Sequence, residues 1–497
     1  MENKGVLLPI SALYTPYGIG DLGPAAYRFA DFLATHDQAY WQILPVSYCG
    51  YGNSPYNPLS SLLGNPYLIS PELLLQKGLI STHDLAKAAL PSYGNIDYAQ
   101  VYQSKDAMFD IAVLNYLKHH DILPYIDQHS EDVKPVMAFL TLQHIYGNSA
   151  WYTWEEKHHH YNEELYQKLL SSHRFTMLRT AVLQEIFESQ ITDLRAYLKE
   201  LSITLIGDIP LYVASESADV WANQEYFSLT EQGERIMVAG VPPDAFSDEG
   251  QLWGNPIYLW DKMREHNYEW FVHRIGKTMQ DFDLLRLDHF IGYVNYWQIP
   301  ATELTAIDGA WIDGPGAELF DVLCAKYGKD VFIAEDLGIL SDKVCQVRDS
   351  FGFPGMIILQ FCYDDQIPET EYFPHNKLIY TGTHDNQTTR GWYCELLENK
   401  PDAIRNLMDY FRKHKLIQQA EELTEHNISL LLIESAYASP CKIAIIPFQD
   451  ILALDDDARC NIPGTALGNW EWRMQDTDYA APAIQQWSSL NKRYNRG

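Results

Sequence analysis

A short apolar run that ends in polar or charged residues recurs along the 497-residue chain and constrains the fold most. Its copies are apolar on both faces, as parallel strands buried between two layers must be. The expected strands are Gly5–Leu8, Tyr40–Pro45, Ile203–Asp208, Leu284–Asp288, Val331–Glu335, Met356–Phe361, Leu378–Thr381 and Lys442–Pro447. Eight such strands predict an α/β fold, a (β/α)8 TIM barrel. Because such barrels typically take about 250 residues, this single domain over residues 1–497 must carry large insertions.

The largest insertion is expected between the second and third strands, at about residues 48–202. Two groups of apolar residues within it recur at helical spacing. The first group is Phe109, Ala112, Val113, Tyr116 and Leu117, and the second is Leu194, Tyr197, Leu198 and Leu201. The spacing therefore predicts a largely helical insertion.

A second irregular segment, Gly240–Pro256, reads GVPPDAFSDEGQLWGNP. Its proline and glycine content argues against a helix or a central strand. It follows the third expected barrel strand, so it predicts a long loop over the barrel mouth that carries Trp253. Loops of this length are often functional lids.

Composition excludes several classes of protein. Lys and Arg number 36 and Asp and Glu number 66, for a net charge of −30, which argues against nucleic acid and anionic membranes as partners. There is no apolar run of about 18 residues and no signal-peptide pattern, so neither a membrane span nor secretion is expected. Seven cysteines without C-x-x-C spacing fit reduced thiols in a cytoplasmic protein better than a disulfide framework.

Carboxylates follow four of the expected strands, and barrel enzymes place their catalytic groups at these strand ends. The four are Asp208, Asp288, Glu335 and Asp385. A single Asp at a strand end is usually a helix cap or a turn residue. The whole set, with Arg286 two residues before Asp288 and His384 directly before Asp385, is difficult to explain structurally. It therefore predicts an active site.

The fourth expected strand suggests a nucleophile. Side chains alternate along a strand, so Arg286 and Asp288 share the inward face, while Leu285 and Leu287 point toward the helices. An Arg inside a barrel needs a partner, and a nearby cation favours the ionised form of Asp288. An ionised carboxylate suits nucleophilic attack on a glycosidic carbon.

The fifth expected strand suggests a general acid. Glu335 shares the inward parity of Val331 and Ile333, and no basic residue lies in its own strand. A partly desolvated carboxyl group near another carboxylate keeps its proton more readily, which suits an acid. Retaining glycosidases hold their two carboxyl groups about 5–5.5 Å apart, and adjacent strands give a separation of that order.

No common metal or cofactor motif is present. The sequence contains no HExxH, no P-loop and no glycine-rich dinucleotide fingerprint. The run His158–His160 could bind a metal, but it lies in a polar stretch and a solvated face is the simpler interpretation. We therefore predict neither a metal nor an organic cofactor.

Long motifs along nearly the whole chain resemble one known family. They include GVLLPISALYTPYGIGDLG, SPYNPLSSLLGNPYLIS, LIGDIPLYVA, GVPPDAFSDEGQLWGNPIY, RLDHFIGY, AEDLG, PGMIILQF, YTGTHDNQTTRGW and NIPGTALGNWEWR. This ordered set resembles the amylomaltases, or 4-α-glucanotransferases, relatives of the α-amylases. The resemblance implies a barrel with the same insertions and no cofactor.

The resemblance also implies roles for individual residues. Asp288 matches the family's nucleophile, Glu335 its acid/base, and Asp385 a third carboxylate that grips sugar hydroxyls. The residues that match the pocket for the reacting glucose are Tyr56, Asp208, Arg286 and His384, and Trp253 matches an aromatic residue near the acceptor side. Many members carry a basic residue where this chain has Ile291, which affects the acceptor side and not the catalytic set.

The expected activity is transfer of α-1,4-glucan segments between malto-oligosaccharides through a covalent glucosyl-enzyme. Two alternatives stay open at this stage. A hydrolase of the α-amylase type would use the same carboxylates with an open acceptor site. A catalytically inactive glucan-binding protein would have no need for a cluster of like charges.

Overall fold

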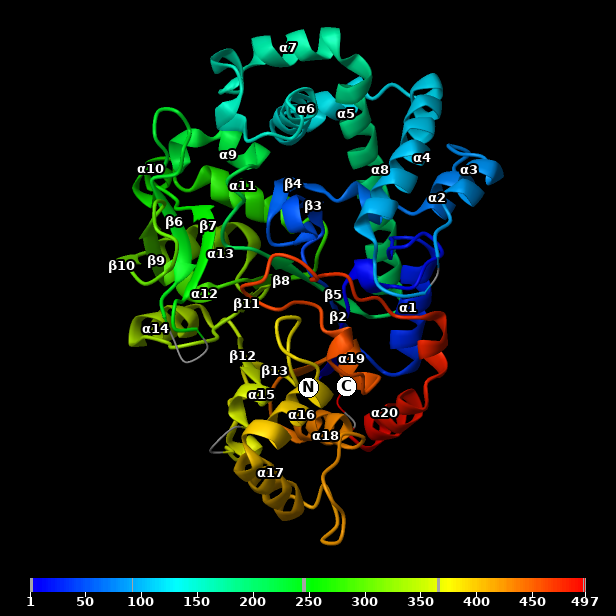
Figure 1. Ribbon diagram of the computed structural model, residues 1–497, viewed down its shortest axis with the longest axis vertical. Helices are drawn as coiled ribbons and strands as arrows, with labels where there is room; N and C mark the ends of the chain where they lie inside the picture. Colours follow the sequence, from blue (N-terminus) through cyan, green and yellow to red (C-terminus); the bar gives the residue numbers. More distant parts are fainter. Residues whose placement is uncertain (1–2, 92, 244–246, 364–366, 495, 497) are drawn as a thin grey trace.

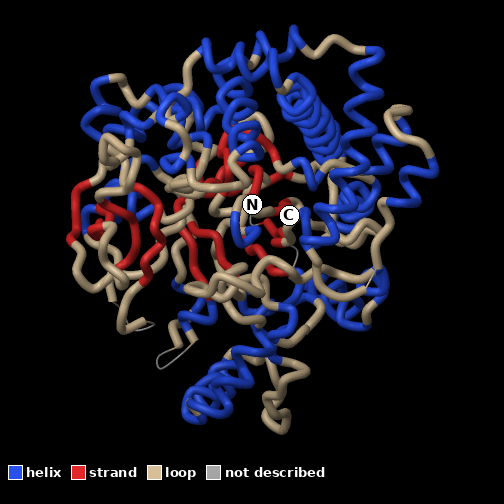
Figure 2. Tube along the Cα trace, turned by 45° about the horizontal axis from the view of Figure 1, so that its top comes forward, coloured by secondary structure: helices blue, strands red, loops and turns tan. Residues whose placement is uncertain are grey.

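The computed structural model describes residues 3–91, 93–243, 247–363, 367–494 and 496. Parallel strands form a nearly closed barrel at the centre, with helices around it (Figures 1 and 2). These strands are β1 (Asn3–Leu7), β2 (Tyr40–Gln42), β5 (Thr204–Ile209), β8 (Leu284–Leu287), β11 (Phe332–Ala334), β12 (Gly355–Ile358), β13 (Lys377–Tyr380) and β14 (Ile443–Pro447). Their order is β11-β8-β5-β2-β1-β14-β13-β12. The predicted fold class is therefore confirmed.

Side-chain alternation along the strands separates two apolar cores. Leu285 and Leu287 of β8 pack outward in the large core shared with the helices. Ile333 of β11 and Ile206 of β5 belong to a smaller core inside the barrel. The alternation predicted for β8 is therefore confirmed, and it leaves Arg286, between the two leucines, on the inner side. Ile333 faces inward as predicted, but Val331, which precedes β11, packs against the large core.

The barrel closes at a seam between β11 and β12, the two ends of the sheet order. The backbone N–H of Ala334 donates to the carbonyl of Pro354 at 2.9 Å. A side chain adds a second link, since the backbone N–H of Met356 donates to the carboxylate of Asp336 at 2.6 Å. Closure at this seam therefore depends partly on a side chain.

Several strand ends differ from the prediction. Asp288 and Glu335 lie one residue beyond β8 and β11, and Asp208 lies inside β5. The prediction of strand from Leu359 to Phe361 is wrong, because these residues begin the short helix α15 (Leu359–Cys362) after the pairing of β12 with β13 ends. An apolar run alone does not distinguish a buried strand from a buried helical turn.

Between β2 and β5 the chain forms a small hairpin and a set of helices that occupy the upper part of Figure 1. The hairpin strands are β3 (Ser47–Cys49) and β4 (Pro58–Gly64), and the helices are α2 (Pro71–Gln76), α3 (Thr82–Lys87), α4 (Tyr98–His119), α5 (Leu123–Gln128), α6 (Ser130–Ile145), α7 (Glu163–Ser172) and α8 (Arg174–Glu200). The apolar stripe of α4 is buried at Phe109, Ala112 and Val113. Leu194 and Leu198 of α8 are buried directly before β5.

A second, antiparallel sheet lies beside the barrel (Figure 2). Its strands are β6 (Met237–Val241), β7 (Gln251–Pro256), β9 (Asn295–Pro300) and β10 (Ala310–Asp313), in the order β10-β9-β6-β7. The prediction of irregular structure throughout Gly240–Pro256 is therefore wrong at both ends. Prolines 242 and 243 directly follow β6, and Pro256 ends the edge strand β7, which are positions that tolerate proline. Residues 244–246 of this segment lie outside the described residues.

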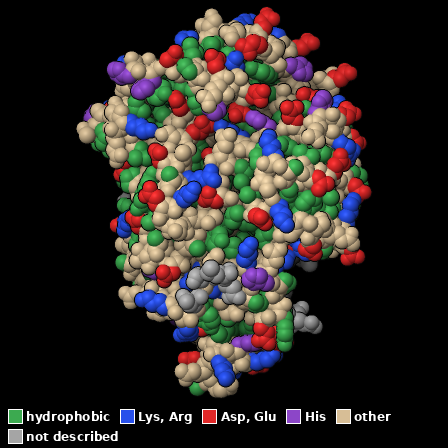
Figure 3. Space-filling view, turned by 180° about the vertical axis from the view of Figure 1, so that it is seen from behind, with side chains coloured by type: hydrophobic (Ala, Val, Ile, Leu, Met, Phe, Trp, Pro, Cys, Tyr) green, Lys and Arg blue, Asp and Glu red, His purple; other side chains and the backbone are tan. Residues whose placement is uncertain are grey.

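Further helices complete the layer around the barrel. They are α1 (Pro24–Thr35), α9 (Ala218–Ala222), α10 (Trp260–Glu265), α11 (Glu269–Thr278), α12 (Phe290–Val294), α13 (Ala317–Tyr327), α14 (Asp342–Phe351), α16 (Thr389–Asn399), α17 (Pro401–Lys413), α18 (Ile428–Ala438), α19 (Phe448–Ile451) and α20 (Pro482–Arg493). Within the described ranges, no helix has the length and apolarity needed to span a membrane. On the face in Figure 3, Lys and Arg side chains are scattered among acidic ones and form no continuous stripe.

Candidate active site

The carboxyl ends of β5, β8 and β11 bring three carboxylates around one guanidinium. In the ladder, Arg286 lies opposite Asp208 of β5 and opposite Ile333 of β11. Arg286 Nη1 lies 2.5 Å from Asp208 Oδ2 and 3.2 Å from Asp288 Oδ1. Arg286 Nη2 lies 2.9 Å from Glu335 Oε1. The strand register therefore places one buried cation between three acidic groups.

Asp288 is less readily ionised than the sequence suggested. Burial raises the pKa of its carboxyl group well above the usual value, the Glu335 carboxylate raises it further, and Arg286 only partly opposes these effects. Arg286 favours the ionised form of Asp288, as predicted, but burial and the Glu335 carboxylate outweigh it. The reason is geometric, because this guanidinium is shared among three carboxylates and its nearest contact is with Asp208.

Glu335 also has surroundings that its own strand did not reveal. Its own strand holds no basic residue, as the sequence shows, but Arg286 reaches it from the neighbouring strand. The backbone N–H of His289 donates to its other oxygen, Oε2. Its own N–H donates to the Leu287 carbonyl at 3.1 Å, and its carbonyl accepts from Phe290 at 3.1 Å. Glu335 is therefore held from the β8 side at both its backbone and its carboxylate.

The buried Asp208 and the half-buried Tyr56 lie beside this group. The Tyr56 hydroxyl donates to Asp208 Oδ2 at 2.7 Å, the same oxygen that Arg286 contacts. Asp208 Oδ1 is buried and has no hydrogen-bond partner among the described residues. Burial raises the pKa of Asp208, and Arg286 opposes this rise. The Tyr56 ring stacks on His384 with centroids 5.2 Å apart and planes at 14°.

Asp385 follows β13 and is held in its ionised form. Its Oδ2 lies 3.3 Å from His384 Nε2, and its Oδ1 accepts from Asn461 Nδ2 at 2.6 Å. Burial acts to raise the pKa of Asp385, but His384 and Asn461 outweigh it, so the net shift is below the usual value. Arg459 donates to the backbone carbonyl of Asp385 at 2.8 Å.

Sequence reasoning missed two members of this site. Asn461 lies 76 positions along the chain from Asp385, whose carboxylate it contacts. The Trp470 ring lies 5.7 Å from Tyr56 and 6.0 Å from His384, between centroids. Both residues belong to the segment NIPGTALGNWEWR, which the family resemblance includes, so the motif was a signal of their importance although no role followed from it.

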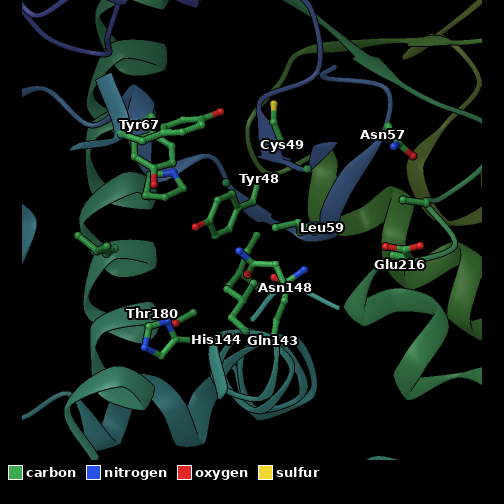
Figure 4. A pocket seen from close by; sticks show the side chains of 18 of the residues that line it. Tyr48, Cys49, Asn57, Leu59, Tyr67, Gln143, His144, Asn148, Thr180 and Glu216 are labelled. Atoms are coloured by element: carbon green, nitrogen blue, oxygen red, sulfur yellow. The ribbon is translucent and has the colours of Figure 1, made fainter. Parts of the chain in front are cut away.

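Trp253 approaches the carboxylates from the edge strand β7. Its ring meets His289 edge to face at a centroid distance of 4.8 Å, and the residue is 38% exposed. Trp253 also lines a neighbouring cavity of about 1040 Å³ that the three carboxylates do not line. Figure 4 shows Tyr48 of β3 above Gln143 and Asn148 in this cavity, with Thr180 of α8 to one side. Trp253 thus connects the site with the cavity.

A possible metal-ligand group lies outside this site. Among the described residues, the side chains close enough to share an ion are Glu369, Glu371 and His414. Glu369 already forms ion pairs with Lys413 and His414. In the histidine run, His158 Nδ1 bonds the Tyr146 hydroxyl at 2.8 Å, and His159 Nε2 bonds the carbonyl of Trp154. The barrel-mouth carboxylates belong to neither group.

Comparison with known proteins identifies the family. The sequence model of the 4-alpha-glucanotransferases, glycoside hydrolase family 77, matches residues 8–478. The chain is 37% identical over 502 residues to the 4-alpha-glucanotransferase of Streptococcus pneumoniae serotype 4, covering 98% of this chain and 95% of that protein. It is 37% identical over 485 residues to the Aquifex aeolicus 4-alpha-glucanotransferase, covering 96% of each.

A solved structure agrees with the sequence relatives. The amylomaltase from Streptococcus agalactiae in complex with acarbose is similar with a TM-score of 0.92 and 34% sequence identity, over 100% of both chains. The family model, the full-length relatives and this structure all indicate the same activity. The chain therefore belongs to the amylomaltase family and is a 4-alpha-glucanotransferase.

Proposed function

We propose that the transfer is a retaining double displacement on malto-oligosaccharides and α-1,4-glucans. In the first step, Glu335 donates its proton to the glycosidic oxygen while an oxygen of Asp288 attacks C1, and the shortened glucan leaves. In the second step, Glu335 takes the proton of an acceptor 4-hydroxyl, whose oxygen displaces Asp288 from C1. Two inversions retain the α configuration, and the carboxyl groups return to their starting states.

One observation carries this proposal, namely the sharing of Arg286 between Asp288 and Glu335. A retaining mechanism needs two carboxyl groups close together, and one guanidinium between them offsets their repulsion. The side chains of Asp288 and Glu335 are 25% and 15% exposed, whereas that of Arg286 is 2% exposed. The proposed reacting groups therefore face the barrel mouth, and the cation that holds them lies beneath.

Charge around the site bears on the remaining requirements. The mechanism requires a proton on Glu335 and an ionised Asp288, and Arg286 acts to lower the raised pKa of Asp288. Asp385, whose pKa is lowered, stays ionised and can accept hydrogen bonds from sugar hydroxyls.

Aromatic rings around the site suit a chain of glucose units. Tyr56, Trp470 and Trp253 surround the carboxylates, and flat rings of this kind provide large apolar contact faces. Trp253 continues into the neighbouring cavity, which favours a substrate longer than one sugar. The solved relative was bound to acarbose, which agrees with a glucan-like ligand for this chain.

The preference for transfer over hydrolysis depends on how well an acceptor sugar excludes water. Holding an acceptor hydroxyl in line with C1 is worth up to about 7–11 kcal/mol. We propose that Trp253, half-exposed and edge-on to His289, supplies part of this acceptor contact. Its neighbours in β7 would then limit the access of water to the glucosyl-enzyme.

Incubation with maltotriose alone tests the proposed function. A transferase converts maltotriose into both longer and shorter oligomers without raising the number of reducing ends, and thin-layer chromatography with a reducing-sugar assay measures both. Accumulation of glucose and maltose with a matching rise in reducing ends would indicate a hydrolase instead. Unchanged maltotriose would indicate a binding protein. Asp288→Asn is the negative control, since it keeps the shape of the side chain.

A further inference from the structure

The buried carboxylate of Asp336 has no part in the mechanism above. Asp336 is 4% exposed and follows Glu335 immediately in the chain. Its Oδ1 accepts from the backbone N–H of Met356 in β12 at 2.6 Å. Its Oδ2 forms ion pairs with Lys377 at the start of β13 and with Arg348 of α14. One buried carboxylate therefore joins the end of β11 to three other elements.

These contacts occur where the barrel has its weakest backbone connection. β11 and β12 are the two ends of the sheet order, whereas every other pair of neighbouring barrel strands shares a ladder. Glu335 is bonded on the β8 side through its backbone and through His289. On the β12 side, the hydrogen bond of Ala334 is followed by the contacts of Asp336. Glu335 is thus held on the β8 side by its own hydrogen bonds and on the β12 side by those of its neighbours Ala334 and Asp336.

Gly355 is part of the same arrangement. A Cβ atom at Gly355 would overlap the Asp336 carboxylate and the Lys377 ammonium group. The first residue of β12 must therefore lack a side chain for the carboxylate to reach Met356 and Lys377. The fit indicates that the position of Asp336 is specified by its neighbours as well as by its charge.

We infer that Asp336 is a positioning residue for Glu335, an inference that rests on the proposed role of Glu335 as the acid/base. The contacts of Asp336 across the seam between β11 and β12 set the position of the end of β11 at the barrel mouth. They involve Lys377, Arg348 and Gly355. A shift of the Glu335 carboxyl group weakens protonation of the leaving oxygen more than it weakens binding of the glucan. The seam therefore controls turnover and not affinity.

The test uses Asp336→Asn and two substrates that differ in their need for an acid. Maltotriose requires protonation of the leaving oxygen, whereas α-glucosyl fluoride forms the glucosyl-enzyme without it. Misplacement by about 1 Å costs up to about 100-fold. We expect kcat for maltotriose disproportionation to fall by about 10- to 100-fold with KM changed less than about twofold. The rate of the fluoride-release burst should change much less.

Three further variants separate the possible outcomes. Gly355→Ala keeps every charge and displaces the carboxylate, so it should reproduce the difference between the two substrates. Asp349→Asn is the matched control, because Asp349 pairs with the same Arg348 from an exposed position and does not contact Met356. Its kcat should equal that of the unchanged enzyme. Glu335→Gln should show the same substrate difference in a stronger form.

The outcomes distinguish the two levels of the argument. If Asp336→Asn and Gly355→Ala lower both rates by the same factor, or leave both unchanged, while Glu335→Gln separates them, the positioning inference is wrong and the role of Glu335 stands. If Glu335→Gln itself fails to separate the two substrates, the proposed function is wrong. Circular dichroism and the burst amplitude report the folded fraction, so loss of folded protein is not mistaken for loss of positioning.

Discussion

Replacement of Arg286 by Met gives the sharpest test of how the carboxylate cluster is held together. Arg286 is 1% exposed and contacts Asp208, Asp288 and Glu335. Removing one partner from a buried ionic group leaves uncompensated charge and costs about 3–5 kcal/mol. We expect the free energy of unfolding at pH 7.5 to fall by about that amount, as measured by urea denaturation.

The pH dependence identifies charge as the cause. Asp208 and Asp288 have folded-state pKa values above those of the unfolded chain, and Arg286 acts to lower both. A carboxyl group with a raised folded-state pKa loses stability as pH rises from about 4, its unfolded pKa, through its folded value. Without Arg286 this loss becomes larger. The deficit caused by Arg286→Met should therefore be larger at pH 7.5 than at pH 5.

Arg274→Met is the matched control. Arg274 is 0% exposed, but its guanidinium donates to the backbone carbonyls of Pro210 at 2.7 Å and Leu211 at 3.0 Å. Its removal should destabilise the fold with a weaker dependence on pH than that of Arg286→Met, because Arg274 forms no ion pair within the described residues and only acts to lower the raised pKa of Asp219. Equal pH slopes for the two variants, or a constant deficit for Arg286→Met between pH 5 and 7.5, would refute the argument from uncompensated charge.

Three further expectations concern activity. Asp288→Asn should abolish disproportionation with native-like circular dichroism, because the amide is a poor nucleophile; activity above contamination would contradict the assignment of Asp288. Trp253→Ala should raise the ratio of hydrolysis to transfer by about 2- to 13-fold, from about 0.5–1.5 kcal/mol of lost ring contact. A fixed ratio with both rates lowered would put Trp253 on the donor side. EDTA should leave transfer unchanged; a loss that calcium restores would contradict a cofactor-free mechanism.

The sequence predicted the barrel because its evidence is local. Each barrel strand is a short apolar run, and the alternation that turns Leu285 and Leu287 outward is visible within β8 itself. The same alternation put Arg286 on the inner side. Predictions of this kind need only a strand's own residues, and the structure confirms them for β8.

Predictions that depended on a neighbouring strand were less accurate. Glu335 was predicted to lie near another carboxylate, but the cation that reaches it from β8 was not predicted. Asn461, which holds Asp385, lies 76 positions away along the chain. The hairpin of β6 and β7 was missed because its prolines dominate the composition, although they lie at strand ends where proline costs little.

The charges of the site show why register matters more than composition here. The sequence reveals that carboxylates exceed cations near the strand ends, but any of them could pair with Arg286 until the strands are aligned. The alignment of Asp208 opposite Arg286 gives the closest contact to a buried carboxylate. Asp288 and Glu335 contact the same guanidinium at longer distances, so its positive charge fully compensates neither carboxylate. A buried conflict of this kind lowers stability, and a fold retains such conflicts mainly where chemistry requires them. The shared guanidinium is therefore the feature from which both the instability and the proposed reactivity of the site arise.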